Sequence, residues 1–234
     1  MTLWEKVEKQ ERSGRGGLSY ERIAAAGVEL ADAEGLEAVS MRKVAGLLES
    51  GTMSLYRYVS SRDELVELMA DHVMGQVRTP RRTGDWLEDL AEVARTSRRV
   101  LLRHPWLTGH AMSLHAFGPN TLAMMESTLT LLDGHGLSPP ETFELWGTVQ
   151  SFVQGHVLEE RAGQETARRA DTSAEQLRTQ NNSALHRAFS GGQYPRAAKV
   201  FLGLRADIPA DDVFERRLNY LLQGLTGAFA RRPL

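Results

Sequence analysis

The chain has 234 residues, of which 41% are hydrophobic and 25% are charged, and it contains no cysteine. This balance is typical of a globular protein with a sizeable core, and the lack of thiols excludes disulfides, zinc–thiolate centres and cysteine nucleophiles. A formal net charge of −2 argues against a general nucleic-acid coat protein. The polar N-terminus and the lack of a long apolar run predict no secretory signal, no membrane span and a cytoplasmic location.

The first part of the chain is predicted to be a flexible arm followed by a compact group of helices. Residues 1–17 are polar and charged and form the predicted arm, and residues 18–78 form the helical group. Three helices are expected to begin at the caps Ser19, Ser40 and Ser61. Gly35 supplies the stop after the first helix, and Glu64 completes an S-x-x-E capping box with Ser61. A further short helix is predicted over residues 52–59, after a turn at 49–51.

The rest of the chain is predicted to form a larger helical domain. A Thr-Pro-Arg-Arg-Thr-Gly break at 79–84 marks the boundary, so that this domain covers residues 84–234. Its long segments have helical periodicity, whereas the polar stretch 161–182 is predicted to be a loop. No segment alternates in the way that strands do, and the predicted fold class is all-α.

The predicted short helix combines polar, aromatic and basic side chains over two apolar anchors, Leu55 and Val59. Residues 40–62 carry four basic side chains and one acid, a local charge of +3. Such a face suits a helix-turn-helix reader in the major groove of DNA. The predicted DNA contacts are Ser40, Arg42, Thr52, Met53, Ser54, Tyr56, Arg57, Tyr58 and Arg62. The competing interpretation is a solvated helix face with two half-buried tyrosines.

Leu18–Val73 closely resembles the tetracycline-repressor (TetR) family of bacterial transcriptional regulators. The motifs that carry the resemblance are RIAAA at 22–26, LAD at 30–32, GL at 35–36, SMRKVA at 40–45, MSLYRYV at 53–59 and DEL at 63–65. Less specifically, DW at 85–86, HPW at 104–106, GPN at 118–120 and GHVLE at 155–159 resemble the effector and dimerisation domain of the branch containing TetR itself. The resemblance implies a homodimeric transcriptional repressor with a three-helix head. Such a repressor binds double-stranded DNA at a near-palindromic operator and responds to a small-molecule effector.

The sequence departs from the family in two places. Glu49 and Ser50 stand where the family usually has a glycine and then an apolar residue, so a left-handed glutamate there would cost roughly 1 kcal/mol unless Gly51 takes that role. The residues by which TetR itself binds magnesium–tetracycline do not align, and tetracycline is not carried over as the effector.

The larger domain is expected to bind an apolar effector and a second copy of the chain. The candidate effector residues are Trp106, His110, His115, Phe117, Met125, Trp146 and Gln150. Helices near 141–160 and 211–229 are apolar on two faces and must bury both. Their predicted dimer-interface residues are Leu145, Val149, Phe152, His156, Phe214, Leu218, Leu221 and Leu225. For any one of these aromatic, aliphatic or histidine side chains, ordinary core packing is the competing interpretation.

Catalytic motifs such as H-E-x-x-H, G-x-S-x-G, the P-loop and G-x-G-x-x-G are absent from the sequence. We therefore predict no enzyme, no metal site and no cofactor. Two alternatives remain open from sequence. One is an all-α enzyme or carrier that merely contains a helix-turn-helix. The other is a dimeric interaction module whose head has lost DNA binding, for which the Glu49–Ser50 turn is the only support.

Overall fold

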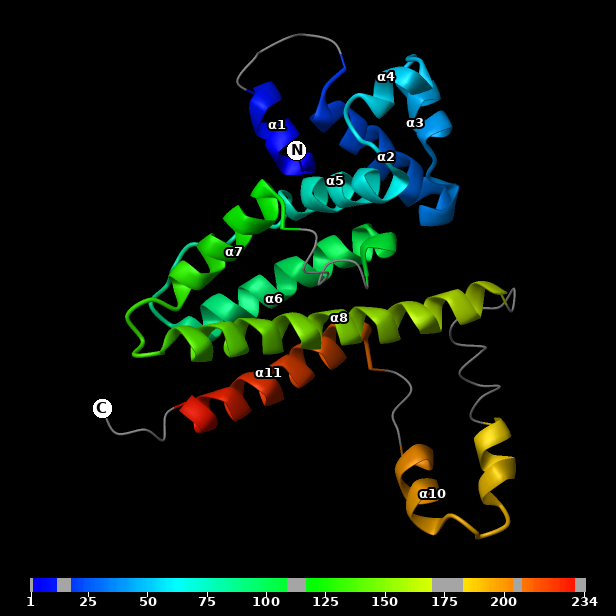
Figure 1. Cartoon of the computed structure of the whole chain (residues 1–234). Coiled ribbons are helices and arrows are strands. Elements are labelled where there is room, and N and C mark those ends of the chain that lie inside the picture. Colours follow the sequence, from blue (N-terminus) through cyan, green and yellow to red (C-terminus); the bar gives the residue numbers. More distant parts are fainter. Residues whose placement is uncertain (1, 12–17, 109–116, 170–182, 204–207, 230–234) are drawn as a thin grey trace. The chain divides into compact units, whose positions relative to one another are not determined.

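The computed structural model describes residues 2–11, 18–108, 117–169, 183–203 and 208–229 (Figure 1). Within these ranges the regular secondary structure is helical and no strand forms, so the predicted all-α class is confirmed. The chain divides into two compact units, Met1–Gln154 and Gly155–Leu234. This division falls inside a long helix, whereas the boundary at 79–84 predicted from sequence lies within the first unit.

The N-terminal segment is a helix where the sequence analysis predicted a flexible arm. α1 (Leu3–Glu11) places Leu3 and Val7 one turn apart, and both side chains are buried. The ammonium group of Lys6 lies 2.9 Å from the hydroxyl of Ser60 and 3.5 Å from the carboxylate of Glu64. These apolar and polar contacts order residues 3–11, while residues 12–17 of the predicted arm lie outside the described residues.

The head (residues 18–78) is built from five helical elements, three of which start at the predicted serine caps. The five elements are α2 (Tyr20–Glu34), the 3₁₀ turn η1 (Leu36–Ala38), α3 (Met41–Leu47), α4 (Thr52–Tyr56) and α5 (Arg62–Met74). The hydroxyls of Ser19, Ser40 and Ser61, the caps of α2, α3 and α5, each accept a hydrogen bond from the backbone N–H three residues on. Each such cap contributes about 1 kcal/mol. The fully buried core side chains of the head include Ile23, Val44, Leu55, Val59, Leu65 and Met69.

The turn between α3 and α4 is a Schellman motif with a glutamate in its positive-φ position. The N–H of Ser50 donates to the carbonyl of Ala45 at 2.9 Å, and the N–H of Glu49 donates to the carbonyl of Gly46 at 3.1 Å. Glu49 has φ 51°, whereas Gly51 has φ −73° and forms the N-cap of α4. The glutamate therefore takes the left-handed role itself, and Gly51 does not replace it.

The short helix α4 ends at Tyr56 and does not reach Val59 as predicted. Beyond its end, the N–H groups of Arg57 and Tyr58 donate three residues back, to the carbonyls of Ser54 and Leu55. This tightening turns the chain early, so that both Leu55 and Val59 point into the core at 0% exposure. The two apolar anchors were predicted correctly, and only the helix length was overestimated.

The remaining helices include the two that were predicted near residues 141–160 and 211–229. They are α6 (Trp86–Arg103), the 3₁₀ turn η2 (Pro105–Leu107), α7 (Pro119–Leu131), α8 (Pro139–Arg169), a helix over 183–189, α10 (Pro195–Leu202) and α11 (Ala210–Phe229). α8 continues through 161–169, which the sequence analysis assigned to a loop. Alanine, glutamate, glutamine and arginine dominate that stretch, and their helix propensity extends the helix although few apolar side chains are available.

In the second unit, the part of α8 after Gly155 pairs with α11. The ring of His156 lies edge-on to Phe214, with 5.1 Å between the ring centroids. The guanidinium of Arg217 lies 2.6 Å from the carboxylate of Glu159, and this hydrogen bond lowers the pKa of Glu159. Because the ion pair is largely exposed, the buried ring contact is the main tie between the two helices.

Replacing Glu49 by glycine is expected to stabilise the chain. Glu49→Gly should raise the free energy of unfolding by about 1 kcal/mol, because a side chain at positive φ costs energy that glycine avoids. Urea denaturation followed by circular dichroism measures the change. Glu49→Gln keeps the Cβ and removes only the charge, so it should leave stability within about 0.5 kcal/mol. Equal gains in both variants would assign the effect to charge and contradict the backbone explanation.

Candidate nucleic-acid interface and effector site

The outward face of α4 exposes large side chains while its inward face is fully buried. Leu55 is 0% exposed, whereas Met53 is 78% and Tyr56 is 47% exposed. Arg57 is also exposed, and Thr52 and Ser54 are half-buried beside them. One buried leucine thus anchors a single-turn helix that offers an apolar, aromatic and basic surface. Thymine methyls, base edges and phosphates are the DNA groups that such a surface can contact.

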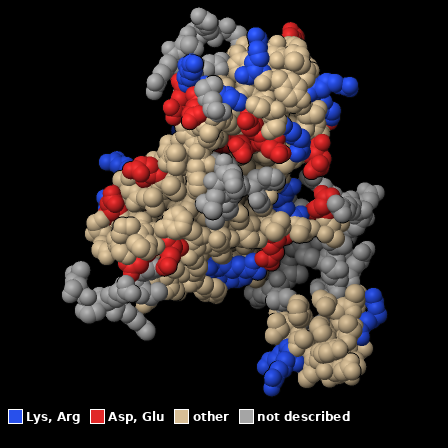
Figure 2. Space-filling view, in the orientation of Figure 1, with Lys and Arg blue, Asp and Glu red and all other residues tan. Residues whose placement is uncertain are grey.

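The start of α3 adds basic side chains next to this face. Arg42 is exposed, and Figure 2 shows Lys and Arg side chains around α3 and α4. Lys43 lies 2.7 Å from the carboxylate of Glu34, so its charge is already balanced. The hydroxyl of Ser40 is occupied by its helix cap. Of these three candidates near the α3 N-terminus, Arg42 is the side chain best placed for a phosphate.

Two of the predicted DNA contacts have partners inside the protein. The hydroxyl of Tyr58 donates to the carbonyl of Leu18 at 2.6 Å, and its ring lies edge-on to Tyr20. The guanidinium of Arg62 donates to the carbonyls of Leu36 and Val39 at 2.8 and 3.0 Å. These bonds hold the loops of the head, and they engage the phenol donor of Tyr58 and two of the five N–H donors of Arg62. The DNA contacts predicted for Tyr58 and Arg62 stay predictions.

A carboxylate on α2 ties the head to the corner between α6 and η2. Asp32 accepts from the indole N–H of Trp106 at 2.8 Å and lies 2.9 Å from Nδ1 of His104. The other ring nitrogen of His104 lies 3.2 Å from the side-chain oxygen of Gln76, just after α5. This junction connects both long helices of the head to one corner of the larger domain. Trp106, predicted as an effector contact, uses its only donor here.

A second carboxylate ties α5 to the start of α7. Asp71 is 2% exposed and accepts three hydrogen bonds, from the N–H of Asn120 at 3.2 Å and from the N–H and hydroxyl of Thr121 at 2.8 Å each. It thus caps a helix that begins about fifty positions later in the chain. A carboxylate at a helix N-terminus satisfies free N–H groups and interacts favourably with the helix dipole. Figure 1 shows the first turn of α7 beside α5.

Apart from Trp106, the predicted effector residues fall into three groups. Trp146 and Gln150, one turn apart on α8, are buried, and the indole N–H and the amide NH₂ have no hydrogen-bond partner. Phe117 and Met125 are half-buried on the chain leading into α7 and on α7 itself. His110 and His115 lie outside the described residues. Because a buried donor without an acceptor costs free energy, Trp146 and Gln150 are the strongest candidates for a ligand contact.

Most of the predicted dimer-interface residues are buried within one chain. Leu145, Val149, His156, Phe214 and Leu218 are at most 7% exposed. Side chains that are already buried cannot supply the surface of an interface, so these five belong to the core. Phe152, Leu221 and Leu225 are half-buried. The competing interpretation, ordinary core packing, is therefore the right one for the five.

Sequence reasoning missed the two carboxylates that join the head to the larger domain. Asp71 had a detectable signal, because it stands among the apolar residues Leu68, Met69 and Val73 on the predicted fourth helix. Asp32 had none, since an aspartate on the exposed side of a helix is ordinary.

Within the described residues, no helix is long and apolar enough to cross a membrane.

Comparison with known proteins identifies close relatives along almost the whole chain. The model of the tetracyclin repressor-like C-terminal domain matches residues 79–228. The HTH-type transcriptional repressor DrrR1 of Streptomyces coeruleorubidus is 37% identical over 98% of this chain and 85% of its own length. An HTH-type transcriptional regulator of Saccharopolyspora erythraea is 33% identical over 95% of this chain and 90% of its own length.

Solved structures agree with these relatives. The crystal structure of apo ActR from Streptomyces coelicolor has a TM-score of 0.76 and 30% sequence identity, covering 92% of this chain and 97% of ActR. The complex of ActR with actinorhodin has the same TM-score and identity, covering 91% and 99% of the two chains. The helix-turn-helix head, the all-helical fold and these similarities along nearly the full length show that the chain belongs to the TetR family of transcriptional regulators.

Proposed function

We propose that this protein is a homodimeric repressor that binds a near-palindromic operator and is released from it by a small apolar effector. The observation that carries the proposal is the exposed face of α4 on its buried anchor Leu55. DrrR1, the similar protein of Streptomyces coeruleorubidus, is a transcriptional repressor, which supports the same direction of control here. DNA that is bound in this way is in the cytoplasm of a bacterial cell, where we expect the protein to act.

In the proposed complex, α4 lies in the major groove. Met53 and Tyr56 contact thymine methyls and base edges, and Arg57 reaches a guanine or a phosphate. Arg42 contacts the phosphate backbone, which sets the position of the head without reading sequence. Thr52 and Ser54 contribute short polar contacts. Tyr58 and Arg62 act indirectly, by holding the loops from which α3 and α4 extend.

The effector is proposed to bind against the inward face of α8 at Trp146 and Gln150. Their two unused donors favour a ligand with an apolar body and at least two acceptor oxygens about one helical turn apart. ActR, which resembles this chain along most of its length, has been crystallised with actinorhodin and with (S)-DNPA. Actinorhodin is therefore the first compound to titrate against this protein.

Effector binding is proposed to act on DNA through the two carboxylate junctions. Asp71 joins α5 to α7, and Asp32 joins α2 to the corner at His104. Any movement of α7 or of that corner is passed to the head, because both junctions are made of hydrogen bonds with fixed geometry. A typical coupling of about 1–3 kcal/mol would lower operator affinity by roughly fivefold to a hundredfold.

The dimer is proposed to form through α8 and α11, with exposed side chains in place of the buried ones predicted from sequence. In the second unit, Leu158 on α8 is 62% and Tyr220 on α11 is 66% exposed. Large apolar groups at such exposure favour contact with a second chain. A two-fold dimer would present two heads to two half-sites. The family match from residue 79 onwards supports a head over 18–78 and an effector and dimerisation domain over 84–234.

Mutations on the exposed face are expected to weaken DNA binding without unfolding the protein. The operator is first selected from a random DNA pool and then titrated by fluorescence anisotropy at several salt concentrations. Arg42→Ala should weaken binding to all sequences and reduce the salt slope by about 1, because one phosphate contact is lost. Tyr56→Ala should cost about 1–3 kcal/mol on the selected operator and much less on random DNA.

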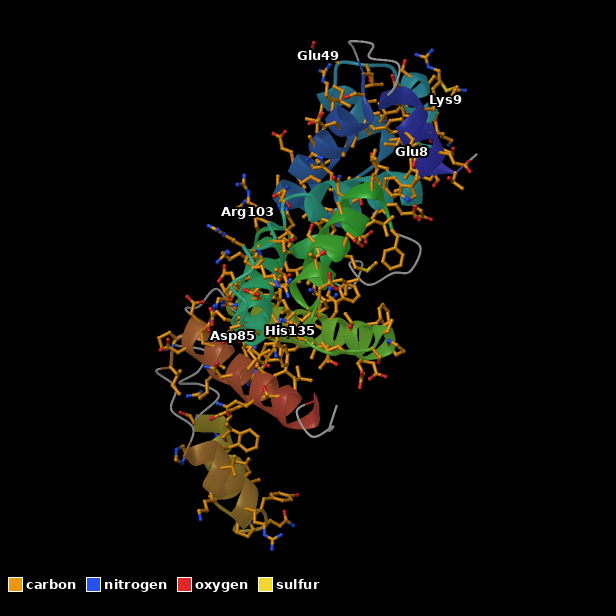
Figure 3. The ribbon with its side chains drawn as sticks, turned by 90° about the vertical axis from the view of Figure 1, so that its left-hand side faces the viewer. Glu8, Lys9, Glu49, Asp85, Arg103 and His135 are labelled. Atoms are coloured by element: carbon orange, nitrogen blue, oxygen red, sulfur yellow. The ribbon has the colours of Figure 1, made fainter. Side chains whose placement is uncertain are left out.

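Arg103→Ala is the matched control for Arg42, since Arg103 is exposed on α6 and lies away from the turn at Glu49 (Figure 3). It should leave both the affinity and the salt slope unchanged. If the pool yields no preferred sequence, or if both head variants bind the operator as tightly as the unaltered chain, the proposed interface is wrong. A folded dimer without sequence preference would favour the interaction-module alternative.

Replacing Gln150 by an apolar residue of similar length is expected to stabilise the chain in the absence of effector. Gln150→Met removes a buried donor that has no acceptor, and the free energy of unfolding should rise by about 1–2 kcal/mol. Gln154→Met, one turn further along α8 and half-buried, should have little effect. Urea denaturation checks both variants. Destabilisation by Gln150→Met would mean that the amide has a partner, and it would remove the main argument for this effector site.

A further inference from the structure

A cavity of about 590 Å³ lies between α1, α2, α5 and the start of α7, entirely within the first unit. Its volume is in the range of pockets that hold drug-sized molecules. None of the predicted effector residues that the structure describes lines it, so it is separate from the site at Trp146 and Gln150. Its walls come from α1, from the head and from the start of α7, and Asp71 joins the head to α7.

Two aromatic rings, those of Trp4 and Tyr20, are among the walls of this cavity. The indole of Trp4 packs against the backbone of Gly118, where an added Cβ would lie 2.6 Å from the ring. Tyr20 is 8% exposed and packs edge-on against Tyr58, with 5.2 Å between the ring centroids. Burial is the main cause that raises the pKa of Tyr20, and the nearby Tyr58 and Glu64 raise it further. The phenol of Tyr20 therefore stays neutral. The cavity therefore has preformed aromatic walls.

The charges that line the cavity are all of one sign. Glu21 and Asp71 are carboxylates, and none of the described residues that line the cavity is a lysine or an arginine. Asp71 is occupied by its three hydrogen bonds to the start of α7. Glu21 is exposed at the edge of the cavity. A charged ligand at this position would be attracted only if it were positive.

We infer that this cavity is a second small-molecule site that binds an organic cation with a flat aromatic body. The ring system would stack between Trp4 and Tyr20, and the positive charge would lie near the carboxylate of Glu21 and the aromatic faces. His72 and Gln76 add polar groups at the side formed by α5. Binding of such a cation would be a property of the folded chain alone and would not require DNA.

A ligand bound in this cavity would contact the head directly. Tyr20 and Glu21 belong to α2, whereas Asn120 belongs to the first turn of α7, so one ligand would touch both sides of the junction made by Asp71. The covering wall is α1, whose Lys6 is tied to the start of α5. Figure 3 shows Glu8 and Lys9 of α1 at the head end of the first unit.

The test uses two dyes with the same xanthene ring system and opposite charge. Rhodamine 6G is a cation and fluorescein is an anion at neutral pH, and the binding of each to the DNA-free protein is followed by fluorescence anisotropy. Rhodamine 6G is expected to bind with a Kd below about 100 μM, and fluorescein at least tenfold more weakly. No saturable binding of rhodamine 6G, or equal binding of both dyes, would overturn the inference.

Variants then locate the bound dye. Glu21→Gln and Trp4→Ala should each weaken rhodamine 6G binding by about fivefold or more. Glu29→Gln is the matched control, because it removes an exposed carboxylate from the same helix α2 outside the cavity. Gln150→Met controls for binding in the effector site. Loss of dye binding in Gln150→Met, or unchanged binding in Glu21→Gln, would overturn the inference. Since Glu21 is exposed, its variant tests the site even if Trp4→Ala disturbs α1.

Discussion

The buried carboxylate of Asp71 is the contact on which the first unit depends most. Three donors from the start of α7 converge on it, and they would otherwise be free N–H and O–H groups at a helix terminus. Removing either partner would leave charge or donors buried without compensation, which costs far more than the net gain of forming the bonds. A substitution on only one side of this junction would therefore destabilise the connection between the head and the larger domain.

The junction at Asp71 is a polar connection between the head and the larger domain. A second polar junction, from Asp32 to His104 and Trp106, joins α2 to the larger domain. In the proposed mechanism, a displacement of α7 or of the His104 corner would rotate α3 and α4, because the head is attached at both junctions. The exposed face at Met53 and Tyr56, which we propose contacts DNA, would then be positioned by contacts made elsewhere in the first unit, as regulation by a ligand requires.

Much of the head could be predicted because its signals are local. Serine caps at 19, 40 and 61 act within one turn of the chain, and the core spacing of Leu55 and Val59 follows from helical geometry. The left-handed position of the turn could be narrowed to Glu49 or Gly51, and the structure places it at Glu49. Contacts between distant residues could not be predicted, as with the hydrogen bonds of Tyr58 and Arg62, whose acceptors lie 40 and 23–26 positions away.

The sequence by itself determined the all-α class and the family, because periodicity, caps and motifs depend on near neighbours. Only the tertiary structure decided that α1 packs on the head, that Leu145 and Phe214 are core side chains, and that Asp32 and Asp71 join the domains. These facts depend on which helix faces meet. Two apolar faces on one helix look alike in sequence, and burial alone separates the face that packs inside the chain from the face that remains exposed.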